Sequence, residues 1–351
     1  MFQIFLLYSE YVQVYSTGSG QRLARFSVDA NLKGLLNHEM AISPDSQHVV
    51  LAGKERLALF EMVESQDTIS YKPRAAMNLG STLATTNIIF SHDPNRTIST
   101  HTILGKKSTF GSIVLWNFWE KQLKTKVGLP SPVVPQFLYH LQPLASHDLV
   151  ICGCSNGHIS VVDMDLGQLV VEVGDPLLMP GPQAKILSSF SSTSGLLLAG
   201  VRGQTSVQLW NMDLTTSKQV MTLNLVRDLA ALCLTGDGKS VIIGDSTGNV
   251  FLYSATESPT LIRTLKAHDE SITVINCDDL DQVVTVGADH TLKLWDLESV
   301  EDETSIVNVV QESTTNAVLL ENEVVTCCCV TKDGHHIITG KYMLYFKFSF
   351  F

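Results

Sequence analysis

Short runs of apolar residues recur along the whole chain, and each ends in an aromatic or β-branched residue followed by Asp, Asn, Ser or Glu. The end residues of these runs are Tyr15, Phe60, Trp116, Val162, Trp210, Tyr253 and Trp295. Consecutive end residues lie 45, 56, 46, 48, 43 and 42 positions apart. Runs of this length and composition are typical of β-strands. The pattern therefore predicts one small β-sheet per interval, repeated along the chain.

A finer pattern repeats inside each interval. Between Arg227 and Ser254 the apolar runs LAALCL, SVIIGD and NVFLYS are separated by the turn sequences TGDGK and STGN. Gly, Asp and Asn suit tight hairpins, which need positive φ angles. Helical periodicity is not sustained over any stretch of about ten residues. The sequence predicts an all-β protein with four antiparallel strands per interval, and a period of about 40–45 residues is typical of β-propeller blades.

The segment 266–299, KAHDESITVINCDDLDQVVTVGADHTLKLWDLES, resembles the repeat of the WD-repeat family. The resemblance extends in weaker form over residues 1 to about 340. It implies a WD-repeat β-propeller, and it places four residues at the positions of the family's hydrogen-bonded tetrad: His268, Thr285, Asp289 and Trp295. Such a tetrad would let an aspartate, an imidazole, a hydroxyl and an indole N–H satisfy one another when buried.

The other intervals depart from this repeat at the position of the tetrad aspartate. Six residues before each aromatic or β-branched end residue the chain has Lys54, Phe110, Asn156, Gln204 and Thr247. Only Asn156 has comparable turn chemistry. We therefore expect five blades to lack the full tetrad and to depend on ordinary packing.

Two motifs suggest catalysis, but their context argues against it. Residues 153–157, GCSNG, match the G-x-S-x-G pattern of hydrolases, yet the strand-like HISVVD follows where the nucleophile elbow needs a helix. Residues 236–240, GDGKS, resemble the end of a phosphate-binding loop, but a strand-like segment follows there too. Ser155 is therefore interpreted as a turn residue, and no catalytic residue is predicted.

Composition narrows the classes of partner. Lysine and arginine number 24 and aspartate and glutamate 35, a formal net charge of −11 that argues against nucleic-acid binding. The seven cysteines, including the run 327–329, have neither a disulfide framework nor the paired spacing of a metal site. We expect reduced thiols, a cytoplasmic location, no metal and no other cofactor. No apolar run approaches the length of a membrane span, so no membrane segment is expected.

The predicted domain covers residues 1–341, with six complete repeats and a partial repeat at each end. Residues 2–16 are interpreted as the last two strands of one blade, and residues 306–339 as the first two or three of another. Joining them would give seven blades without an exposed sheet edge; a slice of a longer array is the alternative. The aromatic tail 342–351 has three interpretations: a substitute closing strand, a membrane-touching tail, or a gene-model or splice artefact.

The resemblance implies a non-enzymatic protein-interaction scaffold, because the family consists mostly of docking platforms. The irregular loops are the candidate contact sites. One is the apparent insertion RTISTHTILGKKSTFG, which would explain the 56-residue interval; the other is GDPLLMPGPQAK. Their candidate partner-binding residues are His101, Lys106, Lys107, Leu178 and Met179.

Within the family, the elongated and degenerate blades resemble the arrays of NACHT-and-WD-repeat proteins. This resemblance implies a partner-sensing or regulatory region of a larger signalling protein, with a nucleotide-binding NACHT module in the same full-length chain. The alternative is a substrate-recognition subunit of a ubiquitin ligase or of another multiprotein complex. Such receptors often carry Arg two residues after Trp-Asp, and here Leu297 and Glu298 follow Trp295-Asp296.

Overall fold

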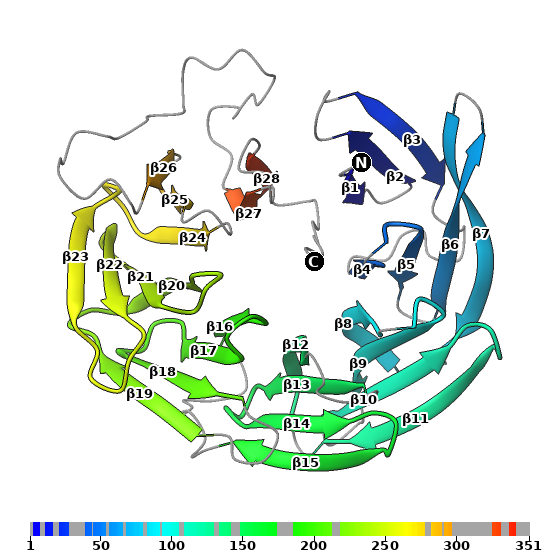
Figure 1. Ribbon diagram of the computed structural model, residues 1–351, viewed down its shortest axis with the longest axis horizontal. Helices are drawn as coiled ribbons and strands as arrows, with labels where there is room; N and C mark the ends of the chain where they lie inside the picture. The colour runs from blue at the N-terminus through cyan, green and yellow to red at the C-terminus, as the bar shows by residue number, and fades with distance from the viewer. Residues whose placement is uncertain are drawn as a thin grey trace. The chain divides into compact units, whose positions relative to one another are not determined.

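The computed structural model shows a protein built from β-strands (Figure 1). It describes residues 3–7, 11–16, 21–27, 39–43, 45–53, 56–65, 68–79, 83–91, 93–104, 109–129, 133–141, 148–173, 185–212, 218–277, 282–289, 291–296, 325–330 and 337–341. Every regular element within these ranges is a strand, so they contain no helix suited to crossing a bilayer. The predicted all-β class is confirmed.

Met1–Gln183 belong to a first compact unit, whose described strands form antiparallel sheets in sequence order. The first sheet consists of β1 (Gln3–Leu7), β2 (Tyr11–Ser16) and β3 (Arg22–Ser27). The second consists of β4 (Glu39–Ile42), β5 (His48–Ala52), β6 (Arg56–Ser65) and β7 (Thr68–Asn78). The third consists of β8 (Leu83–Phe90), β9 (Arg96–Leu104), β10 (Thr109–Asn117) and β11 (Gln122–Gly128). The fourth consists of β12 (Pro135–Leu141), β13 (Leu149–Cys154), β14 (Ile159–Asp163) and β15 (Gln168–Val173).

Ala184–Met343 belong to a second unit of the same design. Its first sheet consists of β16 (Ile186–Ser191), β17 (Leu196–Val201), β18 (Ser206–Asn211) and β19 (Lys218–Asn224). The next consists of β20 (Leu229–Leu234), β21 (Ser240–Asp245), β22 (Asn249–Ser254) and β23 (Leu261–Lys266). The remaining strands are β24 (Ile272–Cys277), β25 (Gln282–Gly287) and β26 (Leu292–Asp296) in one sheet, with β27 (Val325–Val330) and β28 (Ile337–Lys341) in another.

The end residues that define the sequence period all lie in third strands or their equivalents: β2, β6, β10, β14, β18, β22 and β26. In six of these sheets the pairing with the following outer strand shifts by one residue directly before the end residue, as between Leu115 and Trp116 or Leu209 and Trp210. Such a β-bulge bends the strand and increases its twist. The period therefore marks a repeated bulge, and the predicted four-stranded organisation is confirmed for five sheets.

Two details of the prediction were wrong. The sheet at the N-terminal end has three described strands rather than two, because β3 pairs with β2 beyond the expected limit at residue 16. The 56-residue interval does not contain an extra loop around residue 101. Its length comes from extended hairpins, since β6 and β7 have 10 and 11 residues and β9 and β10 have 9 each.

The seven-blade closure stays a prediction.

Successive sheets within a unit share their apolar cores. First strands contact one another, β4 with β8 and β8 with β12 in the first unit, and β16, β20, β24 and β27 in turn in the second. One apolar cluster joins Val50 to Ile88 of the next sheet, and another joins Ile113 to Val150. Burial of one such side chain stabilises the fold by about 1.5–3 kcal/mol. Each sheet therefore depends on its neighbour for a core.

Gly248 connects two successive sheets of the second unit. It lies between β21 and β22 with φ 87°, and its carbonyl accepts the N–H groups of Ala267 at 3.0 Å and His268 at 2.9 Å. A Cβ on this glycine would lie 2.1 Å from the carbonyl oxygen of His268 and 2.5 Å from that of Glu270. Both the backbone angle and the close approach require glycine here.

Gly248→Ala should therefore destabilise the protein more than Gly203→Ala. Gly203 has a similar φ of 80° but open space around its Cβ position, so it reports the conformational cost alone. That cost is about 1–2 kcal/mol, and Gly248→Ala should exceed it because backbone atoms must move as well. Urea denaturation of both variants measures the difference. Equal losses would show that the approach to His268 is not tight.

Candidate functional site

The four residues predicted to form a tetrad lie within hydrogen-bonding distance of one another in the β24–β26 sheet. Nε1 of Trp295 donates to Oγ1 of Thr285 at 2.9 Å, and that oxygen lies 2.8 Å from Nε2 of His268. Nδ1 of His268 lies 3.0 and 3.2 Å from the two carboxylate oxygens of Asp289. The indole is a donor only and the carboxylate an acceptor only, so the chain of bonds is directional. His268 donates from Nδ1 and accepts at Nε2.

Electrostatics favour this arrangement. Burial lowers the pKa of His268, although the Asp289 carboxylate acts in the opposite direction. For Asp289 burial opposes ionisation, but hydrogen bonds from the Asp269 backbone N–H and from Thr291 lower its pKa overall. A neutral imidazole beside an ionised carboxylate matches the directional chain. These groups are engaged in holding the β25–β26 turn and the loop before β24, which is a structural role.

A second indole–hydroxyl–imidazole network lies inside the β8–β11 sheet. Nε1 of Trp116 donates to Oγ of Ser99 at 2.7 Å, and that oxygen lies 2.6 Å from Nε2 of His101. Nδ1 of His101 lies 3.3 Å from Oγ1 of Thr85. Burial, with a smaller contribution from Lys126, lowers the pKa of His101 to about 4. His101 is therefore a neutral, fully buried member of a polar network.

The two networks occupy equivalent positions in their sheets. Trp116 pairs with Thr97 and Trp295 pairs with Val283. The hydroxyl residues Ser99 and Thr285 lie two positions after these partners. His101 and Gly287 lie four positions after them. A Cβ on Gly287 would lie 2.5 Å from Nδ1 of His268, so that imidazole fills the space above the glycine. In the β24–β26 sheet the imidazole is that of His268, from the loop before the first strand. In the β8–β11 sheet it is that of His101, from the second strand, β9.

The β16–β19 sheet has a tryptophan without this support. Trp210 is 1% exposed, and its Nε1 has no hydrogen-bond partner among the described residues. Trp210 pairs with Leu197, so the position equivalent to Ser99 is Ala199, which has no hydroxyl. An unbonded buried N–H is costly. Packing alone holds this indole.

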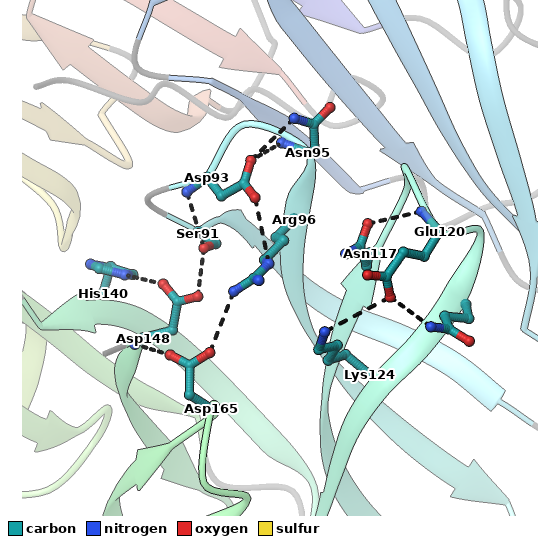
Figure 2. A network of polar contacts seen from close by, with 11 residues as sticks. Ser91, Asp93, Asn95, Arg96, Asn117, Glu120, Lys124, His140, Asp148 and Asp165 are labelled. Carbon is teal, nitrogen blue, oxygen red and sulfur yellow. Dashed lines mark hydrogen bonds and ion pairs between the residues drawn. The ribbon is translucent and has the colours of Figure 1, made fainter. Parts of the chain in front are cut away.

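Another polar network links the β8–β11 and β12–β15 sheets (Figure 2). Oγ of Ser91 donates to Oδ2 of Asp148 at 2.6 Å, and the Asp148 backbone N–H donates to Oδ2 of Asp165 at 2.8 Å. Arg96 reaches Asp165 at 3.4 Å through Nη1 and Asp93 at 3.5 Å through Nε. Turns from two sheets are thereby fixed to each other.

Ser91, His140 and Asp148 of this network have the residue types of a hydrolytic triad but not its order. His140 lies 3.3 Å from Oδ1 of Asp148, and Ser91 bonds the other oxygen of the same carboxylate. A triad needs the histidine between the other two, so that it can take the serine proton. Here the carboxylate is in the middle, and the arrangement orders the turns without activating Ser91.

The interpretation of residues 153–157 as a hairpin turn is confirmed. Ser155 lies in the turn between β13 and β14, and its Oγ accepts the Val134 backbone N–H at 3.0 Å. Residues 236–239 form the turn between β20 and β21, and Ser240 begins β21; Oγ1 of Thr235 donates to Asp237 at 2.8 Å. No group of three potential metal ligands lies within the described ranges.

The prediction for His101 was wrong, because this residue is a buried strand residue and not a loop contact. The signal that could have located it is the polar alternation of Thr97, Ser99 and His101 along a strand preceding a tryptophan. The other candidate contacts, Lys106, Lys107, Leu178 and Met179, lie outside the described residues.

Large apolar side chains are exposed in both units, on outer strands, in hairpin turns and, for Val226, in the connection between β19 and β20. The fully or largely exposed ones include Trp119 (70%), Leu166 (62%), Leu169 (50%), Val226 (97%), Leu261 (52%) and Ile262 (56%). No sequence motif marks them.

Trp295→Ala should lower the free energy of unfolding by roughly 3–5 kcal/mol, as for other large buried aromatics. Trp295→Phe and Trp210→Phe form a matched pair, since only the first removes a hydrogen-bonded indole N–H. Trp295→Phe should lower the free energy of unfolding by about 1 kcal/mol more than Trp210→Phe does, which is the net value of one hydrogen bond. Denaturant titration of the three variants provides the measurement. A loss below about 1 kcal/mol for Trp295→Ala would contradict its place in the core.

His101 should make stability depend on pH. Its pKa is about 4 in the folded protein against an ordinary 6.5, so the unfolded chain takes up the proton first. The contribution of His101 to the free energy of unfolding is fully present above about pH 6.5 and is lost as the pH decreases toward about 4. The loss is roughly 3 kcal/mol, because each pKa unit corresponds to about 1.36 kcal/mol. Unfolding free energies over this range should fall less steeply for His101→Gln. Identical slopes would contradict a buried neutral imidazole.

Comparison with known proteins agrees with this architecture. Residues 259–296 match the family model of the WD domain, G-beta repeat. WD repeat-containing protein 3 of Mus musculus is 32% identical over 137 residues, which are 39% of this chain and 14% of that protein. Protein SPA1-RELATED 4 of Arabidopsis thaliana is 26% identical over 146 residues, 40% of this chain and 17% of that protein.

Myosin heavy chain kinase C of Dictyostelium discoideum is 27% identical over 156 residues, 44% of this chain and 18% of that protein. The chain thus spans less than a fifth of the length of these relatives. The chain contains a WD repeat at residues 259–296, and the four-stranded antiparallel sheets that precede it are blades of the WD-repeat β-propeller fold.

Proposed function

We propose that this chain is a non-enzymatic platform that binds other proteins. WD-repeat proteins generally act as protein-interaction scaffolds, and the observation that supports this role here is an exposed apolar surface on adjoining outer hairpins. The outer apolar patch consists of Leu123 of β11 with Leu166, Leu169 and Val170 of the β14–β15 hairpin, which are 45%, 62%, 50% and 42% exposed. Contiguous exposed apolar residues are typical of protein-interaction sites.

The two hairpins of the outer apolar patch contact each other. Arg96 of the β8–β11 sheet bonds Asp165, next to Leu166. A Cβ on Gly167 would lie 2.9 Å from Cγ2 of Thr125 in β11, so the β14–β15 turn rests on that strand. Leu123 and Leu166 thus flank one contact between sheets.

The turn that carries Leu166 is held in one conformation before any partner binds. Oδ1 of Asp163 accepts the backbone N–H groups of Asp165 and Leu166, each at 2.9 Å. The Asp165 side chain accepts in turn from Arg96 and from the Asp148 backbone. A preorganised surface loses less conformational entropy on binding, which favours a recognition role for this hairpin.

The proposal extends to a partner-sensing or regulatory region of a larger, cytoplasmic signalling protein. The three relatives named above support this proposal in one respect, because each is much longer than the stretch that it shares with this chain. A nucleotide-binding NACHT module in the same full-length chain is the specific form of this proposal. Sequencing of the full-length transcript tests it, because the chain that contains these repeats should also encode a nucleotide-binding module; a full-length product without one would refute this specific form.

Leu166→Glu combined with Leu169→Glu should abolish binding of direct partners without unfolding the protein, since both side chains are already in water. Leu261→Glu with Ile262→Glu is the matched control, because these residues are similarly exposed on β23 of the other unit. Cross-linking mass spectrometry should place partner cross-links near residues 123 and 166–170 in the control and not in the variant. Unchanged cross-links in both variants would refute the role of the outer apolar patch.

A further inference from the structure

Trp119 differs from the other tryptophans of the chain. The sequence has four, and Trp116, Trp210 and Trp295 are buried at 5%, 1% and 9% exposure. Trp119 is 70% exposed in the turn between β10 and β11. Tryptophan is rarely left in water and is enriched among the residues that dominate binding energy at interfaces. Its exposure therefore requires an explanation beyond folding.

A cavity of about 230 Å³ lies beside Trp119. Its lining combines an apolar floor with two cationic side chains: Leu59, Arg74, Ala75, Asn95, Phe118, Trp119 and Lys121. The β7 strand supplies Arg74, whose guanidinium carbon lies 5.4 Å from the centre of the Trp119 ring. The cavity is thus formed by the outer parts of two successive sheets of the first unit. Its size suits one or two side chains of a partner.

The charge around this cavity is opposite to that of the whole chain. The chain has a net charge of −11. Outer strands β7 and β11 nevertheless contain Lys72, Arg74, Lys124 and Lys126 and no aspartate or glutamate. Two nearby carboxylates are occupied, since Glu61 pairs with Arg74 and Glu120 with Lys124 at 3.8 Å (Figure 2). The surface keeps a local positive excess.

Lys121 is the uncompensated charge at the cavity. Among the described residues no carboxylate pairs with it, and it lies in the left-handed region at φ 53°. A lysine in this conformation carries a backbone cost that glycine or asparagine would avoid. The turn accepts this cost and places an exposed lysine among the residues that line the cavity beside Trp119.

We propose that the cavity bordered by Arg74, Trp119 and Lys121 binds an acidic peptide segment of a partner protein. An apolar side chain of the segment packs on the Trp119 ring, and a neighbouring carboxylate pairs with Lys121. Further acidic residues follow Lys124 and Lys126 along β11, which has an unpaired edge in its sheet and can accept an extended segment. This inference rests on the proposed interaction role and names the chemistry of one partner.

Trp119 itself reports the binding, because it is the one tryptophan of the four in water. The full chain is titrated with a synthetic peptide of glutamates around a single leucine, and with a lysine peptide of the same design. The glutamate peptide should shift the tryptophan emission to shorter wavelength, with an affinity that falls as salt is added. The lysine peptide should produce no shift.

Fluorescein-labelled glutamate peptide then measures affinity for variants by anisotropy. Trp119→Ala and Lys121→Glu should each weaken binding at least about tenfold, as expected for a central aromatic and a paired charge. Lys239→Glu is the matched control, since it makes the same charge change at an exposed lysine of the other unit and should leave affinity unaltered. Circular dichroism confirms that each variant is folded.

Three results would overturn the inference: equal binding of the lysine peptide, unaltered affinity in both Trp119→Ala and Lys121→Glu, or a single-stranded DNA oligonucleotide that outcompetes the peptide at physiological salt. The outcome is separable from that of the proposed function. If the glutamate peptide fails to bind while Leu166→Glu/Leu169→Glu still removes partner cross-links, the interaction role holds and only this acidic-peptide site falls.

Discussion

Leaving a tryptophan N–H unbonded inside an apolar sheet is costly, and the acceptors that Trp116 and Trp295 reach organise the best-defined polar networks of the molecule. Buried polar groups in folded proteins are almost always bonded. In the β24–β26 sheet the acceptor chain runs through Thr285 to an imidazole from the preceding loop. In the β8–β11 sheet it runs through Ser99 to an imidazole from the same strand. The shared geometry is the indole and its hydroxyl partner, while the source of the imidazole varies.

The period of the sheets was predictable because six of the seven end residues lie directly beside a bulge in their strand. A bulge fixes that position in the sheet, so the spacing survives when the turn residues change. The tetrad residues could be located because the segment from Lys266 to Ser299 keeps every member of the repeat. His101 was placed wrongly because the 56-residue interval was interpreted as a loop insertion, whereas longer strands account for its length.

The surfaces could not be predicted for a different reason. Cavity walls such as Arg74 and Trp119 lie 45 positions apart in the sequence and meet only because two outer hairpins are adjacent. The exposed Leu166 and Leu169 of the β14–β15 hairpin follow no alternating pattern, and the sequence does not say which side of an outer hairpin a neighbouring sheet leaves open. The candidate contacts were selected for loop irregularity and therefore did not include the outer hairpins, where most of the described exposed large apolar residues lie.

The bonds from Ala267 and His268 to Gly248 have an evolutionary consequence. The His268 imidazole belongs to the network of the β24–β26 sheet, but its backbone is bonded to the β21–β22 turn of the preceding sheet. The segment that has to be inherited together therefore does not coincide with one blade. A duplication or exchange that cuts at the blade boundary would separate His268 from either its anchor or its hydroxyl. The β8–β11 blade takes its imidazole from its own strand β9, so such an exchange would leave its indole–hydroxyl–imidazole network intact.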